Sequence, residues 1–378
     1  MKTIKNILLL LAIAISGSVR AQVPPGSGLN PGHNIIQLAL LLDVSGSMDG
    51  LINQAKTELW AVANEAAKAS KKQFPARLEI ALYEYGRSTN DVRAGYVKQL
   101  VGFTTDLDTL SKVLFALNTN GGDEYCGQVI AKSLEELQWR KSDSVFKVIF
   151  IAGNEEFTQG TVSYASSCSN AKEKGVLVNT IHCGDSMGGV NGQWHMGAIK
   201  GGGRYFYINS NATFADINTP YDSLIGIYND SLNTTYISYG MRGMEYKTNQ
   251  AVQDMNSKTM GKKAYLERAS AKSKSSAYSN VHWDAVDAYR NDSNYLEKIW
   301  TSGVDSSLGV KNKEELKQLI SRNEGNRGRF QTEISRLTQL RMEYIRDHTA
   351  EISKAKTLGE ALAAAIREQA GKRGFEFL

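Results

Sequence analysis

The stretch from Gln37 to Gly50, QLALLLDVSGSMDG, decides the fold. Its first half is a continuous apolar run, which is typical of a strand that is buried on both faces of a parallel sheet. The run ends at Asp43, and Ser45 and Ser47 follow at alternate positions. Because open α/β sheets bind ligands outside the carboxyl ends of their strands, these oxygen-bearing side chains predict a binding site at that edge.

Strand and helix patterns alternate from residue 35 to about residue 218. Further apolar strands are predicted at 77–85, 96–101, 145–153, 176–184 and 204–208. Helical spacing of apolar residues predicts helices at 51–69, 107–117, 125–139 and 162–174. Strands that alternate with helices of this length indicate βαβ units. The predicted fold class is therefore α/β, a doubly wound and mainly parallel sheet with helices on both faces.

After residue 218 the strand patterns fade and helix-forming residues dominate. One apolar stripe at helical spacing consists of Phe330, Ile334, Leu337, Leu340 and Tyr344. A second stripe, in the last predicted helix, consists of Leu358, Leu362 and Ile366. Such stripes are typical of an intramolecular core. We therefore predict a domain at 35–218 and a helical C-terminal domain at 219–378.

The first residues have the pattern of a secretory signal peptide. Lys2 and Lys5 precede an apolar core at 7–15, and a small-residue cleavage site ends at Ala21. Residues 1–21 are expected to be removed, and the Pro/Gly-rich segment 22–34 is predicted to be a linker. The apolar core is short for a bilayer span, so we expect a secreted or periplasmic protein of bacterial type without a membrane span after cleavage.

The net charge of +5 conceals an uneven distribution. Residues 22–240 hold 17 Lys/Arg and 21 Asp/Glu, whereas residues 241–378 hold 24 and 18. This difference in charge between the two halves supports a division into two domains. The basic residues are interleaved with acidic ones, which is typical of a solvated helical surface, and we do not expect nucleic acid as a partner.

Cys126, Cys168 and Cys183 leave two redox arrangements open. Export permits one disulfide between any two of them, with the third thiol free. The alternative is that all three are unpaired and buried. A thiol hydrolase based on Cys183 would need a histidine within hydrogen-bond reach. The adjacent His182 points to the opposite face of a strand, which leaves His195 as the candidate.

Asp43-x-Ser45-x-Ser47 after a buried first strand resembles the metal-ion-dependent adhesion site of von Willebrand factor type A (vWA) domains. The resemblance covers about residues 35–215 and includes the strand order, the Gly121-Gly122 turn and the closing GGGRYFYI at 201–208. It implies that two serines and a threonine from a second loop bind a divalent cation. Two aspartates would act mostly through water, and a carboxylate of a partner protein would complete the coordination.

This chain departs from the vWA pattern in two loops. Asp123 stands where the resemblance would place threonine, and Gly153, with Asn154 beside it, stands where it would place aspartate. The predicted metal ligands are therefore Asp43, Ser45, Ser47 and Asp123. Further possible ligands or rim residues are Glu124, Asn154 and Glu155, with Glu156 nearby. Mg²⁺, Mn²⁺ and Ca²⁺ are the candidate ions, and Ca²⁺ tolerates the altered loops best because it accepts more oxygens in looser geometry.

These observations predict an exported protein–protein recognition or adhesion module. Its partner is expected to bind through an acidic residue at the cation, and Trp194, in a long Gly-rich loop at 182–197, is a candidate aromatic anchor on the rim. The first alternative is a metal-free structural envelope scaffold. The second is a hydrolase that uses the altered metal site or Cys183. No set of residues resembles paired catalytic carboxylates, a zinc cluster or a serine triad, so we do not expect an enzyme.

Overall fold

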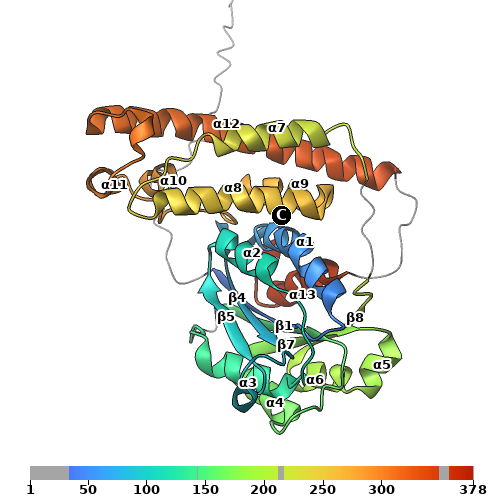
Figure 1. Ribbon diagram of the computed structural model, residues 1–378. Helices are drawn as coiled ribbons and strands as arrows, with labels where there is room; N and C mark the ends of the chain where they lie inside the picture. Colours follow the sequence, from blue (N-terminus) through green and yellow to red (C-terminus); the bar gives the residue numbers. More distant parts are fainter. Residues whose placement is uncertain (1–33, 143, 212–216, 349–356, 378) are drawn as a thin grey trace, which may run out of the picture. The chain divides into compact units, whose positions relative to one another are not determined.

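A six-stranded sheet forms the centre of the computed structural model, which describes residues 34–142, 144–211, 217–348 and 357–377. Its strand order is β5-β4-β1-β6-β7-β8 (Figure 1). The bounds are β1 Ile35–Asp43, β4 Arg77–Tyr85, β5 Lys98–Thr104, β6 Phe146–Gly153, β7 Val176–Cys183 and β8 Gly202–Ile208. All neighbouring pairs are parallel except β4 with β5, which pair antiparallel at one edge. This is the doubly wound order, in which the direction of winding reverses at β1 and creates a ligand-binding crevice at the carboxyl ends.

Strand β1 supplies side chains to both faces of the sheet. Leu38 and Leu40 face one core and Ala39 and Leu41 face the other, as the alternation of a strand requires. The helices that share residues with the first core include α1 (Asp49–Ala66), α2 (Leu107–Ala116) and α13 (Leu358–Gly371). Those of the second core are α3 (Cys126–Glu136), α4 (Tyr164–Glu173) and α6 (Trp194–Lys200). The predicted fold class is thus confirmed.

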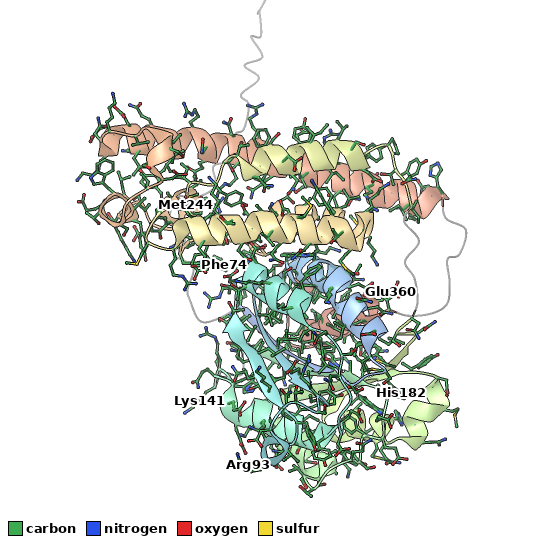
Figure 2. All side chains as sticks on the ribbon, in the orientation of Figure 1. Phe74, Arg93, Lys141, His182, Met244 and Glu360 are labelled. Atoms are coloured by element: carbon green, nitrogen blue, oxygen red, sulfur yellow. The ribbon has the colours of Figure 1, made fainter. Side chains whose placement is uncertain are left out.

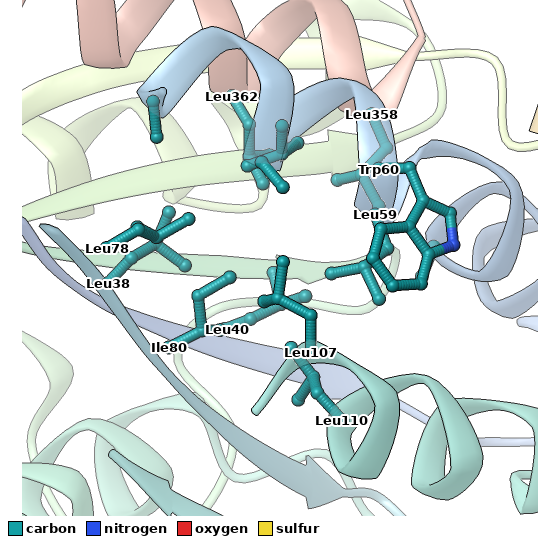
Figure 3. Close-up of a cluster of buried hydrophobic side chains, with 14 of the residues drawn as sticks. Leu38, Leu40, Leu59, Trp60, Leu78, Ile80, Leu107, Leu110, Leu358 and Leu362 are labelled. Atoms are coloured by element: carbon teal, nitrogen blue, oxygen red, sulfur yellow. The ribbon is translucent and has the colours of Figure 1, made fainter. Parts of the chain in front are cut away.

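Helix α13 returns from the end of the chain to the sheet. It begins with a capping box between Thr357 and Glu360. Its Leu358 and Leu362 lie in the same buried cluster as Leu59 of α1 and Leu38 of β1 (Figure 3). The predicted apolar stripe of the last helix therefore belongs to the first core, on the face of the sheet to which Leu38 points.

The remaining helices are contributed mainly by residues 222–348. They are α7 (Asp222–Asn233), α8 (Gly243–Met260), α9 (Lys262–Lys272), α10 (Ala285–Asn291), α11 (Tyr295–Ser302) and α12 (Lys313–His348). Ile334 and Leu337 of the predicted stripe are buried in α12. A buried salt bridge also connects these helices to the sheet domain. Arg268 of α9 pairs with Asp108 of α2 at 2.6 Å. A small antiparallel sheet consists of β2 (Ala69–Lys71), β3 (Phe74–Pro75) and β9 (Glu376–Phe377), and short 3₁₀ helices lie at 92–94 and 306–308.

Residues 34–378 form one compact unit. The predicted boundary between residues 218 and 219 stays a prediction, although α13 lies with the sheet and not only among the C-terminal helices. The predicted signal peptide at 1–21 and nearly all of the predicted linker fall outside the described residues. No helix in the described ranges is long and apolar enough to cross a membrane.

Candidate functional site

Asp43 is the last residue of β1 and is completely buried. Its Oδ1 accepts a hydrogen bond from the backbone N–H of Ser45 at 2.7 Å. Its Oδ2 has no hydrogen-bond partner within the described part of the chain. Burial raises the pKa of Asp43 to about 6; hydrogen bonds from Ser45 and the backbone of Asn154 oppose the rise, and the charge of Glu155 adds to it. The fold therefore holds a carboxylate at the sheet edge in an environment that disfavours its ionised form.

The two serines of the first loop lie beside Asp43 and connect to the third loop. The Oγ atoms of Ser45 and Ser47 are 3.4 Å apart. The side-chain amide of Asn154 donates to Ser47 Oγ at 3.1 Å, and Asn154 Oδ1 is buried without a partner among the described residues. Ser45 is buried while Ser47 is exposed, so the pair runs from the interior to the surface.

Glu124, not Asp123, is the carboxylate of the second loop that faces Asp43. Glu124 is 7% exposed, and burial together with the charge of Asp43 raises its pKa to about 7, although a hydrogen bond with Ser45 opposes the rise. Asp123 is exposed, and its Oδ2 accepts a hydrogen bond from the hydroxyl of Tyr125 at 3.1 Å. The structure therefore brings Glu124 close to Asp43, and the assignment of Asp123 to the threonine position stays a prediction. The two acids are adjacent in sequence, and no periodicity in this loop indicates which one turns inward.

Glycines close the space around Asp43. A Cβ on Gly153 would lie 2.6 Å from the hydroxyl of Tyr85 and 2.9 Å from Asp43 Oδ2. Gly86 has a φ of 81°, and a Cβ there would lie 2.9 Å from Asp43 Oδ1. Tyr85 donates to the carbonyl of Ala152 at 2.9 Å, which fixes its ring at this point. A side chain at position 153, where the vWA resemblance would place an aspartate, would therefore have to displace Tyr85 or Asp43.

Backbone and side-chain hydrogen bonds join the three loops. The N–H of Asn120 donates to the carbonyl of Val44 at 2.9 Å, which ties the second loop to the first. The N–H of Glu124 donates to Gln159 Oε1 at 3.1 Å, which ties the second loop to the third. Loops that restrain one another in this way present a preorganised arrangement of side chains.

Trp194 supports the third loop from inside. Its ring is 1% exposed and lies 4.7 Å from that of Phe157, and its Nε1 donates to the carbonyl of Glu155 at 2.7 Å. The prediction of Trp194 as a rim anchor is therefore wrong. The predicted Gly-rich loop instead forms α5 (Ser186–Asn191) and α6, which begins at Trp194 and brings the ring into the second core. Glu155 and Glu156 themselves are exposed.

All three cysteines are free and buried, so the disulfide left open by the sequence is not formed. Burial raises the pKa of the Cys183 thiol, and the charge of Asp43 adds to the rise. The neighbouring His182, labelled in Figure 2, is buried, and burial lowers its pKa. Its Nδ1 has no hydrogen-bond partner among the described residues. A thiol in these surroundings resists deprotonation, which is the opposite of what a nucleophile requires.

The side chains at the sheet edge form an oxygen-rich donor set. They comprise two carboxylates, two hydroxyls and one amide: Asp43, Glu124, Ser45, Ser47 and Asn154. Across the described ranges, no group of three or more His, Cys, Asp or Glu side chains is placed to hold a metal ion. A set that relies on hydroxyl and amide oxygens is nevertheless chemically suited to a hard divalent cation. The buried, unpartnered oxygens of Asp43 and Asn154 fit such an ion.

Comparisons with known proteins give structural neighbours only. No protein-family model matches the chain, and no curated protein matches it. An aerotolerance-related membrane protein from Bacteroides fragilis is 13% identical, with a TM-score of 0.33, and the match covers 47% of this chain and 93% of that one. BatB from Bacteroides thetaiotaomicron is 15% identical, with a TM-score of 0.34, over 46% and 90% of the two chains. The VWA domain of SpRpn10 is 13% identical, with a TM-score of 0.35, over 47% and 88%.

The topology itself agrees with the fold that the sequence resemblance implies. The winding order reverses at β1, the antiparallel strand lies at the edge, and Asp43-x-Ser45-x-Ser47 follows β1. The chain therefore has a vWA-like fold, with a set of helices between β8 and the last helix of the sheet domain.

Proposed function

We propose that this chain is a protein-recognition module that binds a partner protein at the carboxyl edge of its six-stranded sheet. A divalent cation held between the three loops would organise that edge. The observation that carries the proposal is the completely buried Asp43, whose Oδ2 is unpartnered among the described residues and which faces a second acid, Glu124. Two neighbouring acids buried in this way are costly to ionise unless a positive charge compensates them.

The cation would be held by Asp43, Glu124, Ser45, Ser47 and Asn154. It would supply the positive charge that lets both acids ionise at neutral pH. The chain's own contribution is to fix the three loops relative to one another and to exclude water from Asp43. Ca²⁺ suits this set better than Mg²⁺ or Mn²⁺, because it accepts more oxygens and less regular geometry. The predicted signal peptide supports a role outside the cytoplasm, in recognition or adhesion.

Calorimetric titration of Ca²⁺, Mn²⁺ and Mg²⁺ into chelator-treated protein tests the proposal. We expect micromolar to millimolar binding that is lost in Asp43→Asn and in Glu124→Gln but retained in Asp123→Asn. The Asp123 variant is a matched control, because it removes one carboxylate from the same loop without touching the buried pair. Absence of binding by all three ions would refute the cation. Loss in Asp123→Asn with retention in Glu124→Gln would restore the assignment made from the sequence.

A metal-free scaffold is the second candidate function. It is favoured by the hydrogen bonds among Asn154, Ser47 and Ser45, which connect the loops without an ion. Thermal unfolding distinguishes the two candidates. Equal melting temperatures with saturating Ca²⁺ and with chelator would favour the scaffold, whereas an ion that binds only the native state raises the melting temperature with its concentration.

We propose a binding module in preference to an enzyme. The hydrolase alternative depends on the altered metal site or on Cys183, and the Cys183 thiol is buried with a raised pKa. A Cys183→Ala variant that lost turnover of generic ester or peptide substrates would overturn this preference.

A further inference from the structure

Four exposed carboxylates lie on the segments that flank Asp43 at the carboxyl edge of the sheet. They are Asp49 at the start of α1, Asp123 in the second loop, and Glu155 and Glu156 in the third, and we call these four residues the acidic rim. Glu155 is close enough to Asp43 and Glu124 for its charge to raise the pKa of both. The rim is also restrained, because Thr119 donates to Asp49 Oδ1 at 2.5 Å and Trp194 holds the backbone of Glu155.

The negative charge of this edge exceeds what one divalent cation can offset. The segments 43–49, 117–124 and 153–159 contain six carboxylates and neither lysine nor arginine. A divalent cation offsets two of the six charges. Lys56 offsets a third, because its Nζ donates to the carbonyl of Leu117 at 3.0 Å and its charge interacts with Asp49, so three charges remain. The neighbouring Arg87 does not change this balance, because its side chain is 15% exposed and is already bonded to Glu84 and Asn118.

We infer that the partner contacts the acidic rim through lysine or arginine side chains. The inference rests on the proposed function, since it assigns the partner chemistry of the same edge. A partner that approached with a carboxylate would be repelled by the net negative charge that remains, because charges are screened only beyond about one Debye length, ~8 Å at physiological ionic strength. Complementary charge instead speeds association and excludes partners of the wrong sign. A second observation is that Asp43 Oδ2, on the same edge, is buried without a hydrogen-bond partner among the described residues, an arrangement that a positively charged ligand would satisfy.

The test uses the purified protein and two fluorescent probes, hexalysine and hexaglutamate. Fluorescence anisotropy is measured at saturating Ca²⁺ and at about 0.15 M salt. The rim variant is Glu155→Gln with Glu156→Gln. The control variant is Glu314→Gln with Glu315→Gln, which removes the same charge from an exposed adjacent pair on α12. Ca²⁺ titration of both variants shows whether the cation is affected.

We expect hexalysine to bind and hexaglutamate not to bind. The rim variant should weaken hexalysine binding about three- to tenfold, as the loss of two exposed ion pairs implies, and the control variant should not weaken it. Equal weakening in both variants, or binding of neither probe, would overturn the inference. Ca²⁺-dependent binding of hexaglutamate alone would also overturn it and would indicate capture of a carboxylate at the cation. If Ca²⁺ does not bind but hexalysine still depends on the rim, the partner chemistry stands while the proposed cation fails.

Discussion

Asp43→Asn should stabilise the ion-free protein at neutral pH, even though it changes a completely buried residue. Burial raises the pKa of Asp43 from 3.8 to about 6. Because one pKa unit corresponds to about 1.36 kcal/mol, ionising Asp43 costs ~3 kcal/mol more in the folded than in the unfolded chain. The folded state binds more protons between these two pKa values. Stability contributed by this group is therefore lost as the pH rises from about 4 to about 6.

The asparagine variant removes this dependence because its side chain does not ionise. The amide oxygen of the new side chain would still accept the hydrogen bond from the Ser45 backbone that Asp43 Oδ1 accepts at 2.7 Å. The amide nitrogen takes the place of Oδ2, which has no hydrogen-bond partner among the described residues, and a buried donor without an acceptor there costs ~1 kcal/mol. We therefore expect the variant to be ~1 kcal/mol less stable than the parent at pH 4 and ~2 kcal/mol more stable at pH 7.5.

Urea unfolding followed by tryptophan fluorescence measures this difference in chelator-treated protein. Trp60, Trp194 and Trp283 are buried and report on the folded state. Asp123→Asn is the control variant, because it removes an exposed carboxylate of the same site and leaves Asp43 in place. Saturating Ca²⁺ should reverse the order, because the proposed ion stabilises the parent by ~2.7 kcal/mol at one hundred times its dissociation constant. A constant difference between the Asp43 variant and the parent from pH 4 to 7.5 would refute the reasoning.

Other perturbations test separate parts of the structure. Gly153→Ala should cost ~2 kcal/mol of stability because its Cβ would overlap Tyr85 and Asp43, whereas Gly121→Ala, with no atom within 4 Å, should be nearly neutral by urea unfolding. Gly325→Ala and Gly328→Ala, each with no atom within 4 Å in the long helix α12, should each raise stability by ~1 kcal/mol in the same assay; a loss would show that the helix bends there. Iodoacetamide should label none of the three cysteines in the native protein and all three in urea, as mass spectrometry will show; a single labelled thiol in urea would reveal a disulfide.

The fold could be predicted from the sequence because apolar patterns report burial directly. The run that ends at Asp43 is buried along its whole length, and the stripe that includes Leu358 and Leu362 is buried as predicted. The stripe could not show which part of the protein the last helix packs against. An apolar helix face indicates only that the helix is buried on that side. The contacts of α13 with the sheet domain depend on particular polar pairs, such as Asn179 with Gln369, that are 190 residues apart.

The site was predicted less completely because it depends on loop geometry. Asp43, Ser45 and Ser47 follow a strand whose direction is known, so their place at the sheet edge could be inferred. The choice between Asp123 and Glu124 depends on the backbone torsions of a turn, which leave Asp123 with Tyr125 and direct Glu124 toward Ser45. Trp194 was misplaced because a Gly-rich segment was interpreted as a loop, whereas it forms two short helices.

The change at Gly153 and the inward turn of Glu124 have one physical explanation. A side chain at 153 would overlap the Tyr85 hydroxyl, which is held by the carbonyl of Ala152 in the centre of the sheet edge. A carboxylate at position 153 would therefore be crowded, and the second loop provides one beside Asp43 through Glu124. Burial raises the pKa of both acids, and the charge of Asp43 adds to the rise at Glu124. The proposed cation would have more negative charge around it than two serines and a threonine provide. A cation at such an edge would be bound more strongly and would attract a carboxylate less, so in our proposal the acidic rim, and not the ion, selects the partner.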